Sequence, residues 1–279
     1  MVKLQSIPSI RHALDLFVCN ETLDSAGTSA VVFAPHPDDE TLGCGGTIIL
    51  KREAGTPVSI IFMTDGCASH RQLMPPEQMR RLRKDEALQA AEVLGVAPGN
   101  VHFLNFEDGG LSSCEEAAVT PVLALLEQLG PEEVFVTCRD DGTADHEATY
   151  RIVMEAARRS GRSMRICEYP VWCWHQWPWV PQPLRCNLDM LRVFGRFLRS
   201  GGGLAPWLQF RSGVKIREVH RRKREALARH RSQMIALIAD VSWSTLPDVA
   251  EGRFLELFFQ DYEVFRCSVT RRGSIRPGG

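Results

Sequence analysis

Short apolar runs and longer amphipathic segments alternate along the first 170 residues of the chain. Five runs have the length and the β-branched or aromatic content of strands, and they cover 29–34, 58–63, 101–104, 133–137 and 164–168. Between them, apolar residues recur at helical spacing over 43–54, 76–95, 114–129 and 145–159. This alternation predicts an α/β fold with a Rossmann-like, mainly parallel sheet and helices on both faces.

The pattern changes after residue 170. Four tryptophans lie within residues 172–179, and two of them, Trp172 and Trp174, are candidates either for core packing or for stacking on a sugar ring. Residues 187–210 are apolar with basic residues between them, and 217–237 read as a basic helix. Such a helix is typical of a solvated face, and together with 187–210 it could also contact an anionic membrane surface if the substrate is lipid-linked.

We therefore expect a single domain over 1–279, with its core at about 28–170. The C-terminal residues, about 171–279, are expected to form an elaboration of helices and loops over the active site. A chain of 279 residues with 44% hydrophobic residues can bury a full core.

Charge and cysteine content narrow the function classes. The net charge is −1, which does not favour nucleic-acid binding. The first eight residues lack the apolar core of a secretory signal, and no run approaches the roughly 20 apolar residues that span a bilayer. The nine cysteines show no CxxC spacing, so reduced thiols in a cytoplasmic protein are expected. The oligomeric state cannot be inferred from these features.

The first polar cluster follows the strand at 29–34 and includes His36, Asp38, Asp39 and Glu40. A loop that only caps the next helix needs one acid, whereas this one offers three acids and a histidine. An imidazole nitrogen and carboxylate oxygens suit a zinc-like divalent metal, and a spare carboxylate could move a proton. The sequence therefore predicts metal-dependent chemistry at this strand end.

A second polar cluster, Asp140 to His146, also follows a strand and opens a helix. Because the carboxyl ends of parallel strands meet at one edge of the sheet, His146 is expected to approach His36 and Asp39 as a third metal ligand. The glycine-rich stretch 43–46 does not indicate a nucleotide site, because Ile48 stands where GxGxxG requires glycine. No cofactor-binding residues other than metal ligands are predicted.

At these motifs the chain resembles the PIG-L/LmbE-like N-acetylglucosaminyl deacetylases. The run from Pro35 to Gly46 carries the most specific part of the resemblance. Weaker matches are Thr64-Asp65-Gly66, Arg83 to Ala87, Asp108-Gly109-Gly110, Asp145-His146, and Lys223 with Ser232-Gln233.

The resemblance implies a metal-dependent enzyme, with zinc as the expected metal and ferrous iron as the alternative. It implies His36, Asp39 and His146 as metal ligands and Asp38 as general base. Two histidines and a carboxylate leave coordination positions open for water, as in catalytic zinc sites.

The chain departs from the family pattern at Thr143, where the family usually has a histidine three residues before the ligand histidine. A threonine can donate a hydrogen bond but cannot act as an acid at neutral pH. His175 and His70 are candidates to replace the missing group. The predicted substrate-binding residues are Arg83, Asp108, Thr143 and His175, and for Arg83 a surface ion pair with Glu86 is the alternative.

The predicted function is removal of an N-acetyl group from an amino sugar or an N-acetylglucosamine-containing glycoconjugate. An amidase that cleaves a larger acyl or thiol-conjugate amide is one alternative. A non-catalytic, metal-containing sugar-binding module is another, since Thr143 replaces a histidine.

Overall fold

The structure is a computed structural model of the whole chain. It describes residues 2–4, 21–22, 26–175, 180, 182–184, 191, 195, 209–239, 243–271 and 274–277. Trp177, Trp179 and most of 187–210, the segment for which a membrane contact was considered, lie outside the described residues.

Five parallel strands form one side of a nine-stranded sheet, with β5 at its edge. Their order across the sheet is β5-β4-β3-β6-β7. Their bounds are Ala30–Ala34 (β3), Val58–Thr64 (β4), Val101–Phe106 (β5), Glu133–Thr137 (β6) and Arg165–Tyr169 (β7). All five strands expected from the sequence are present, which confirms the mainly parallel α/β fold.

The C-terminal part of the chain extends this sheet, which the sequence did not predict. Strand β10 runs antiparallel to β7 and pairs with β9 and β11, while β2 lies beyond β9. A separate pair joins β1 to β8. The bounds are Val2–Leu4 (β1), Glu21–Thr22 (β2), Gln182–Leu184 (β8), Ser212–Lys215 (β9), Tyr262–Arg271 (β10) and Ser274–Pro277 (β11).

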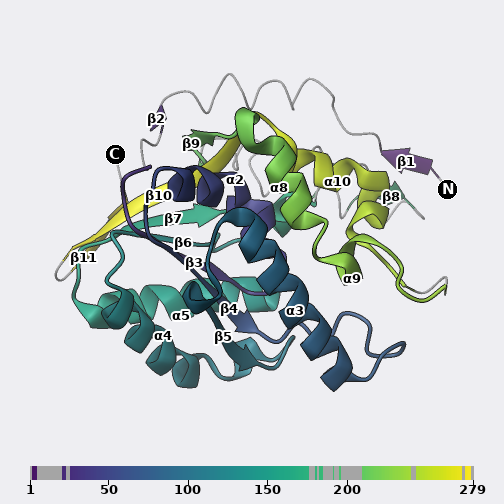
Figure 1. Cartoon of the computed structure of the whole chain (residues 1–279), viewed down its shortest axis with the longest axis horizontal. Coiled ribbons are helices and arrows are strands. Elements are labelled where there is room, and N and C mark those ends of the chain that lie inside the picture. Colours follow the sequence, from purple (N-terminus) through teal and green to yellow (C-terminus); the bar gives the residue numbers. More distant parts are fainter. Residues whose placement is uncertain are drawn as a thin grey trace.

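Helices cover both faces of the sheet, with α2 and α8 on one side and α4 and α5 on the other (Figure 1). Their bounds are Asp39–Glu53 (α2), Pro76–Leu94 (α3), Glu115–Leu129 (α4), Ala144–Ser160 (α5) and His220–Leu227 (α8). Successive residues of a strand point to opposite faces. Val32 therefore packs in the core that includes α2 and α3, and Val31 in the core that includes α4 and α5.

The strand order places a switch point between β3 and β6. From β3 the chain proceeds through α2, β4 and α3 to β5, and it then returns to the other side of β3 as β6 and β7. Crevices outside the carboxyl ends of strands at such a reversal are the usual ligand sites of open α/β sheets. The two polar motifs of the sequence follow these two strands.

The prediction of one basic helix over 217–237 was wrong. The segment forms a short turn, α8 and a further short helix, with a break at His230. The side chain of His230 is buried against Glu40, and this inward turn ends the helical path. The remaining short elements are Pro98–Asn100 (η2), Leu111–Ser113 (η3), Trp172–Trp174 (η4), Arg217–Val219 (η5), Arg231–Met234 (α9), Leu246–Gly252 (η6), Arg253–Glu256 (α10) and Leu257–Phe259 (η7).

Lys223 of α8 is also not on a solvated face. It is fully buried, and its Nζ donates to Glu263 Oε1 at 2.8 Å and to the carbonyl of Leu42 at 2.8 Å. Glu263 in turn accepts the N–H groups of Gly46 and Thr47, each at 2.7 Å. In a regular helix the Gly46 N–H would bond to the Leu42 carbonyl. The buried ion pair of Lys223 and Glu263 thus holds α2 by hydrogen bonds to the backbone groups of that helix.

Glycines let α2 lie this close to its neighbours. A Cβ atom at Gly43 would lie 2.1 Å from the ring of Tyr169, and one at Gly46 would lie 2.4 Å from Ile216.

Among the helices in the described parts of the chain, the structure contains no segment both long enough and apolar enough to traverse a bilayer.

Candidate active site

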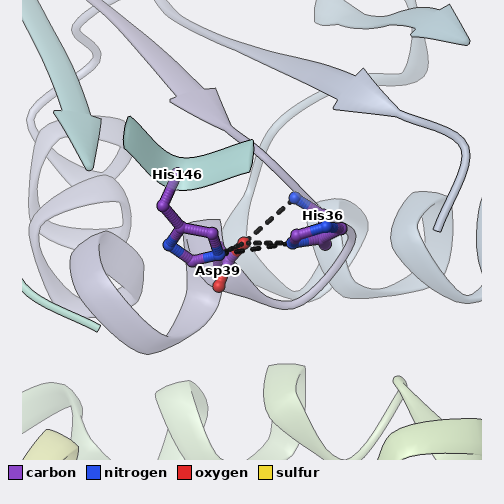
Figure 2. A group of neighbouring side chains, drawn as sticks. All are labelled: His36, Asp39 and His146. Atoms are coloured by element: carbon purple, nitrogen blue, oxygen red, sulfur yellow. Dashed lines mark hydrogen bonds and ion pairs between the residues drawn. The ribbon is translucent and has the colours of Figure 1, made fainter. Parts of the chain in front are cut away.

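Three side-chain atoms form a triangle at the carboxyl ends of β3 and β6 (Figure 2). His36 Nδ1 and His146 Nε2 each lie 3.3 Å from Asp39 Oδ2, and the two nitrogens are 3.3 Å apart. The structure therefore brings together the three residues predicted to be metal ligands.

Three local features build this triangle. His36 lies in the loop after β3, and Asp39 is the first residue of α2. Its Oδ2 accepts the backbone N–H of His36 at 3.0 Å, which closes the loop. His146 lies in the first turn of α5, after β6, and β3 and β6 are parallel neighbours. The shared sheet edge thus joins residues 110 positions apart.

Asp141 orients His146, a role that sequence analysis did not single out. Its Oδ2 lies 2.7 Å from His146 Nδ1, and both residues are fully buried. The carboxylate also accepts the backbone N–H groups of Val171, Trp172 and Cys173. With Nδ1 donating to Asp141, the lone pair of Nε2 points into the triangle, as is usual for a metal-bound histidine.

His36 is oriented in the same way from its other side. Its Nε2 lies 3.1 Å from Asp108 Oδ1 and 3.4 Å from Asp145 Oδ2, so Nδ1 is left to face the triangle. Asp145 also accepts the N–H groups of Gly109 and Leu111. Burial opposes ionisation of Asp108, but the contacts with His36 and the Ala68 N–H lower its pKa to about 2.

Carboxylates outnumber cations around the triangle. Five carboxylates surround the two histidines: Asp38, Asp39, Asp108, Asp141 and Asp145. Burial lowers the pKa of His146, yet Asp39 and Asp141 raise it to about 9. A divalent cation would relieve this excess of buried negative charge.

The donor set fits such a cation. Imidazole and carboxylate bind zinc at about 2.0–2.2 Å in tetrahedral geometry, which puts neighbouring ligand atoms about 3.3 Å apart. The three sides of the triangle have this length. His36, Asp39 and His146 could therefore hold a metal ion without rearrangement.

Asp38 lies beside the triangle and is not a member of it. Its backbone has a φ of 130°, which is uncommon for a residue other than glycine. Its Oδ2 accepts a hydrogen bond from Arg83 at 3.2 Å. Burial raises the pKa of Asp38 to about 6, while Arg83 acts in the opposite direction.

Arg83 is buried, so the alternative of a surface ion pair with Glu86 was wrong. Besides Asp38, its guanidinium donates to the carbonyls of Pro37 and Gly66. Gly66 has a φ of 62°, and a Cβ there would lie 3.1 Å from the Arg83 side chain. Glu86 instead binds Ser232, through the hydroxyl at 2.7 Å and the N–H at 2.8 Å.

Glu40 stabilises the loop that carries Asp38. Its Oε2 accepts the backbone N–H of Asp38 at 2.9 Å, and its Oε1 lies 3.0 Å from His230 Nε2. Both Glu40 and His230 are fully buried. The strained backbone of Asp38 is therefore held by Glu40, and Glu40 is held in turn by His230 of the C-terminal segment, which sequence analysis did not single out.

A cavity of about 320 Å³ opens beside the triangle, a size typical of small-molecule sites. It is lined by His36, Asp38, Asp39, Leu42, Ala68, Ser69, Arg83, Asp108, Thr143, Trp172, Gln233 and Leu246. Trp172, Gln233 and Leu246 come from the C-terminal part of the chain. The buried Thr143 hydroxyl has no hydrogen-bond partner and is a free donor for a ligand.

The two histidines proposed to replace the family histidine lie elsewhere. His175 is exposed, packs edge-on near Trp172 and Phe254, and is not among the residues that line the cavity. His70 stacks on Trp243 at 4.2 Å, and its Nε2 lies 3.0 Å from the Ser244 carbonyl. The geometry thus supports neither as a direct substitute for the group missing at Thr143.

The chain is similar to known proteins both in sequence and in fold. Residues 31–157 match the sequence profile of PIG-L, described as GlcNAc-PI de-N-acetylase. The probable N-acetyl-alpha-D-glucosaminyl L-malate deacetylase 2 of Bacillus cereus is 29% identical over 141 residues, which are 48% of this chain and 63% of that protein. The diacetylchitobiose deacetylase of Thermococcus kodakarensis is 34% identical over 83 residues, 29% of this chain and 30% of that protein.

Both matches cover less than two thirds of the relatives' own length. Among solved structures, the N,N'-diacetylchitobiose deacetylase from Pyrococcus horikoshii superimposes with a TM-score of 0.60 at 20% identity. The superposition covers 92% of this chain and 89% of that one, and it shows a shared fold.

Proposed function

We propose, on the basis of the match of residues 31–157 to the PIG-L sequence profile, that this chain is a metal-dependent N-deacetylase of amino sugars. The observation that carries the proposal is the triangle of His36, Asp39 and His146, with the carboxylate of Asp38 beside it. The relatives act, by their names, on N-acetylated glucosamine derivatives. The substrate class we propose is an N-acetylated amino sugar or a glycoconjugate that carries one.

His36, Asp39 and His146 would hold the metal, for which zinc is our proposal. When bound, such an ion lowers the pKa of a water ligand and polarises an amide carbonyl. Asp38 would accept the proton of the attacking water and return a proton to the leaving amine. Arg83 fixes the Asp38 carboxylate by its hydrogen bond, and Glu40 fixes the Asp38 backbone.

Thr143 and Asp108 are proposed to contact the substrate. Both line the cavity, and the Thr143 hydroxyl is buried without a partner. A buried donor of this kind is unfavourable until a ligand accepts its hydrogen bond. The Thr143 hydroxyl could therefore orient the acetamido group, although it cannot supply a proton as a histidine would.

The proposal is tested by acetate release from a panel of N-acetylglucosamine-containing saccharides. Equal amounts of acetate and free amine are expected, with activity lost in a chelator and restored by added zinc. A larger acid in place of acetate would indicate the amidase alternative. Stoichiometric binding of metal and saccharide without turnover across the panel would indicate the binding module and contradict the proposal.

Asp141→Asn is expected to weaken metal affinity about 10- to 100-fold, because asparagine no longer fixes the tautomer of His146 as a carboxylate does. The affinity is measured by competition with a chromophoric chelator, and folding is checked by circular dichroism. The matched control is Asp140→Asn, since Asp140 is the preceding acid and its side chain is 70% exposed. Equal affinities for the two variants would show that Asp141 does not support a metal ligand.

A further inference from the structure

Two cysteines lie against each other on the far side of β7 from β6. Cys167 of β7 and Cys267 of β10 are directly opposed in the antiparallel register, and their sulfur atoms are 3.1 Å apart. Directly opposed residues of antiparallel strands have Cα atoms about 4.5–5.5 Å apart. Disulfides span Cα separations of about 4.4–6.8 Å, so a bond between these sulfurs requires little backbone movement.

We propose that Cys167 and Cys267 form a reversible disulfide, made by exchange with a low-molecular-weight disulfide. The site is independent of the proposed function, because neither cysteine lines the cavity beside the metal triangle. All cysteines of the described residues are free thiols in this structure. The structure thus shows the reduced form, with the two partners already in contact.

The surroundings assign different roles to the two thiols. Cys267 is partly exposed, whereas Cys167 is fully buried. The hydrogen bond from Cys167 lowers the pKa of Cys267 against the effect of burial, and Ser212 and the cation of Arg165 act in the same direction as that bond. A partly exposed thiol whose pKa is lowered, next to a second thiol, is the arrangement of a reactive and a resolving cysteine.

The exchange proceeds in two balanced steps. The Cys267 thiolate attacks one sulfur of oxidised glutathione, which forms a mixed disulfide and releases one glutathione thiolate. The Cys167 sulfur loses its proton and attacks Cys267, which forms the internal disulfide and releases the second glutathione. Two protein thiols are oxidised, and one glutathione disulfide is reduced to two thiols.

A second cysteine pair of the same chain is a useful contrast. Cys138 and Cys173 lie within 4.8 Å of each other and of the Asp141 carboxylate. Cys138 donates to Asp141 at 3.4 Å, and the neighbouring Cys173 and burial raise the pKa of its thiol. A carboxylate that accepts the S–H group favours the protonated thiol, so this pair is expected to react more slowly.

The disulfide would join two strands whose cysteines are 100 positions apart. Closing a loop of this length restricts the unfolded chain strongly, and the oxidised protein is expected to unfold about 5–10 °C higher than the reduced one. The bond would also fasten β10, which carries Glu263, to the parallel core of the sheet.

The test is incubation of the folded wild-type chain with oxidised glutathione, followed by thiol counting and peptide mapping without reductant. We expect the loss of two thiols, a linked peptide pair containing Cys167 and Cys267, and complete reversal by dithiothreitol. Peptide mapping is needed because a thiol count does not say which cysteines have reacted, and Cys19 and Cys186 lie outside the described residues.

Cys267→Ser and Cys167→Ser should each abolish the linked pair and the rise in unfolding temperature. Cys167→Ser should leave a mixed disulfide with glutathione on Cys267. The matched control is Cys114→Ser, whose partly buried thiol donates to the carbonyls of Gly110 and Leu111. Both effects should persist in this control. A wild-type protein whose Cys267 remains free for alkylation under excess oxidised glutathione would overturn the proposal.

Discussion

Asp38→Asn is expected to lower kcat for N-deacetylation by about 10²- to 10⁴-fold while the metal content stays unchanged. Asparagine has the shape of aspartate and tolerates a positive φ, so the loop and its contact with Arg83 should survive. What the variant loses is the carboxylate that accepts the water proton. The measurement is steady-state acetate release, with metal analysis on the same samples.

Asp85→Asn is the matched control for this variant. Asp85 is an exposed acid on α3, two residues from Arg83, and its replacement should leave kcat unchanged. If Asp38→Asn keeps full activity with metal bound, Asp38 is not the general base. If it loses the metal together with the activity, Asp38 supports the ligands and its proposed role in proton transfer is contradicted.

Lys223→Met is expected to lower the free energy of unfolding by about 3–5 kcal/mol. Methionine fills a similar volume, but it leaves the Glu263 carboxylate buried without its cation, which is the costly way to break an internal ion pair. It also leaves the Leu42 and Phe258 carbonyls without the donor that Lys223 supplies. Urea denaturation followed by circular dichroism measures the change.

Arg221→Met serves as the control for Lys223→Met, because Arg221 is an exposed cation on the same helix. Its replacement should change stability by less than about 0.5 kcal/mol. In the double variant Lys223→Met with Glu263→Gln, the loss should be smaller than the sum of the two single losses by at least about 1 kcal/mol. A strictly additive double variant would show that the two charges do not stabilise each other.

The sequence was sufficient for the parallel core and for the residues of the triangle. A core strand such as β4 is buried on both faces, so it appears in the sequence as an unbroken apolar run. Helix α3 ends at Gly95, whose φ of 88° is the left-handed conformation that glycine favours at a helix end. The approach of His146 to His36 was expected because the parallel strands of one sheet present their carboxyl ends at the same edge, and β3 and β6 are neighbours in this sheet. The apolar pattern of the strands and the common edge of parallel strands were therefore enough to predict the parallel core and the triangle.

The contacts of the C-terminal segment could not be predicted from the sequence. Lys223 lies in a basic run that is typical of a solvated helix, and only tertiary structure shows its burial against Glu263. The role of His230 depends on its contact with Glu40, and no periodic pattern in the sequence indicates a contact between residues 190 positions apart. Asp141 is one of several neighbouring acids, and its position behind His146 is fixed by backbone groups of residues 171–173.

The contact between Glu40 and His230 also sets the order in which the site can be completed during synthesis. The two residues are 190 positions apart, whereas the three residues of the triangle have all been synthesised once the ribosome has passed residue 146. A nascent chain can thus bring the three residues of the triangle together well before the support for Asp38 exists. Assembly of the proton-transfer geometry must wait for the last part of the chain, because long loops close only after their distant end has been made.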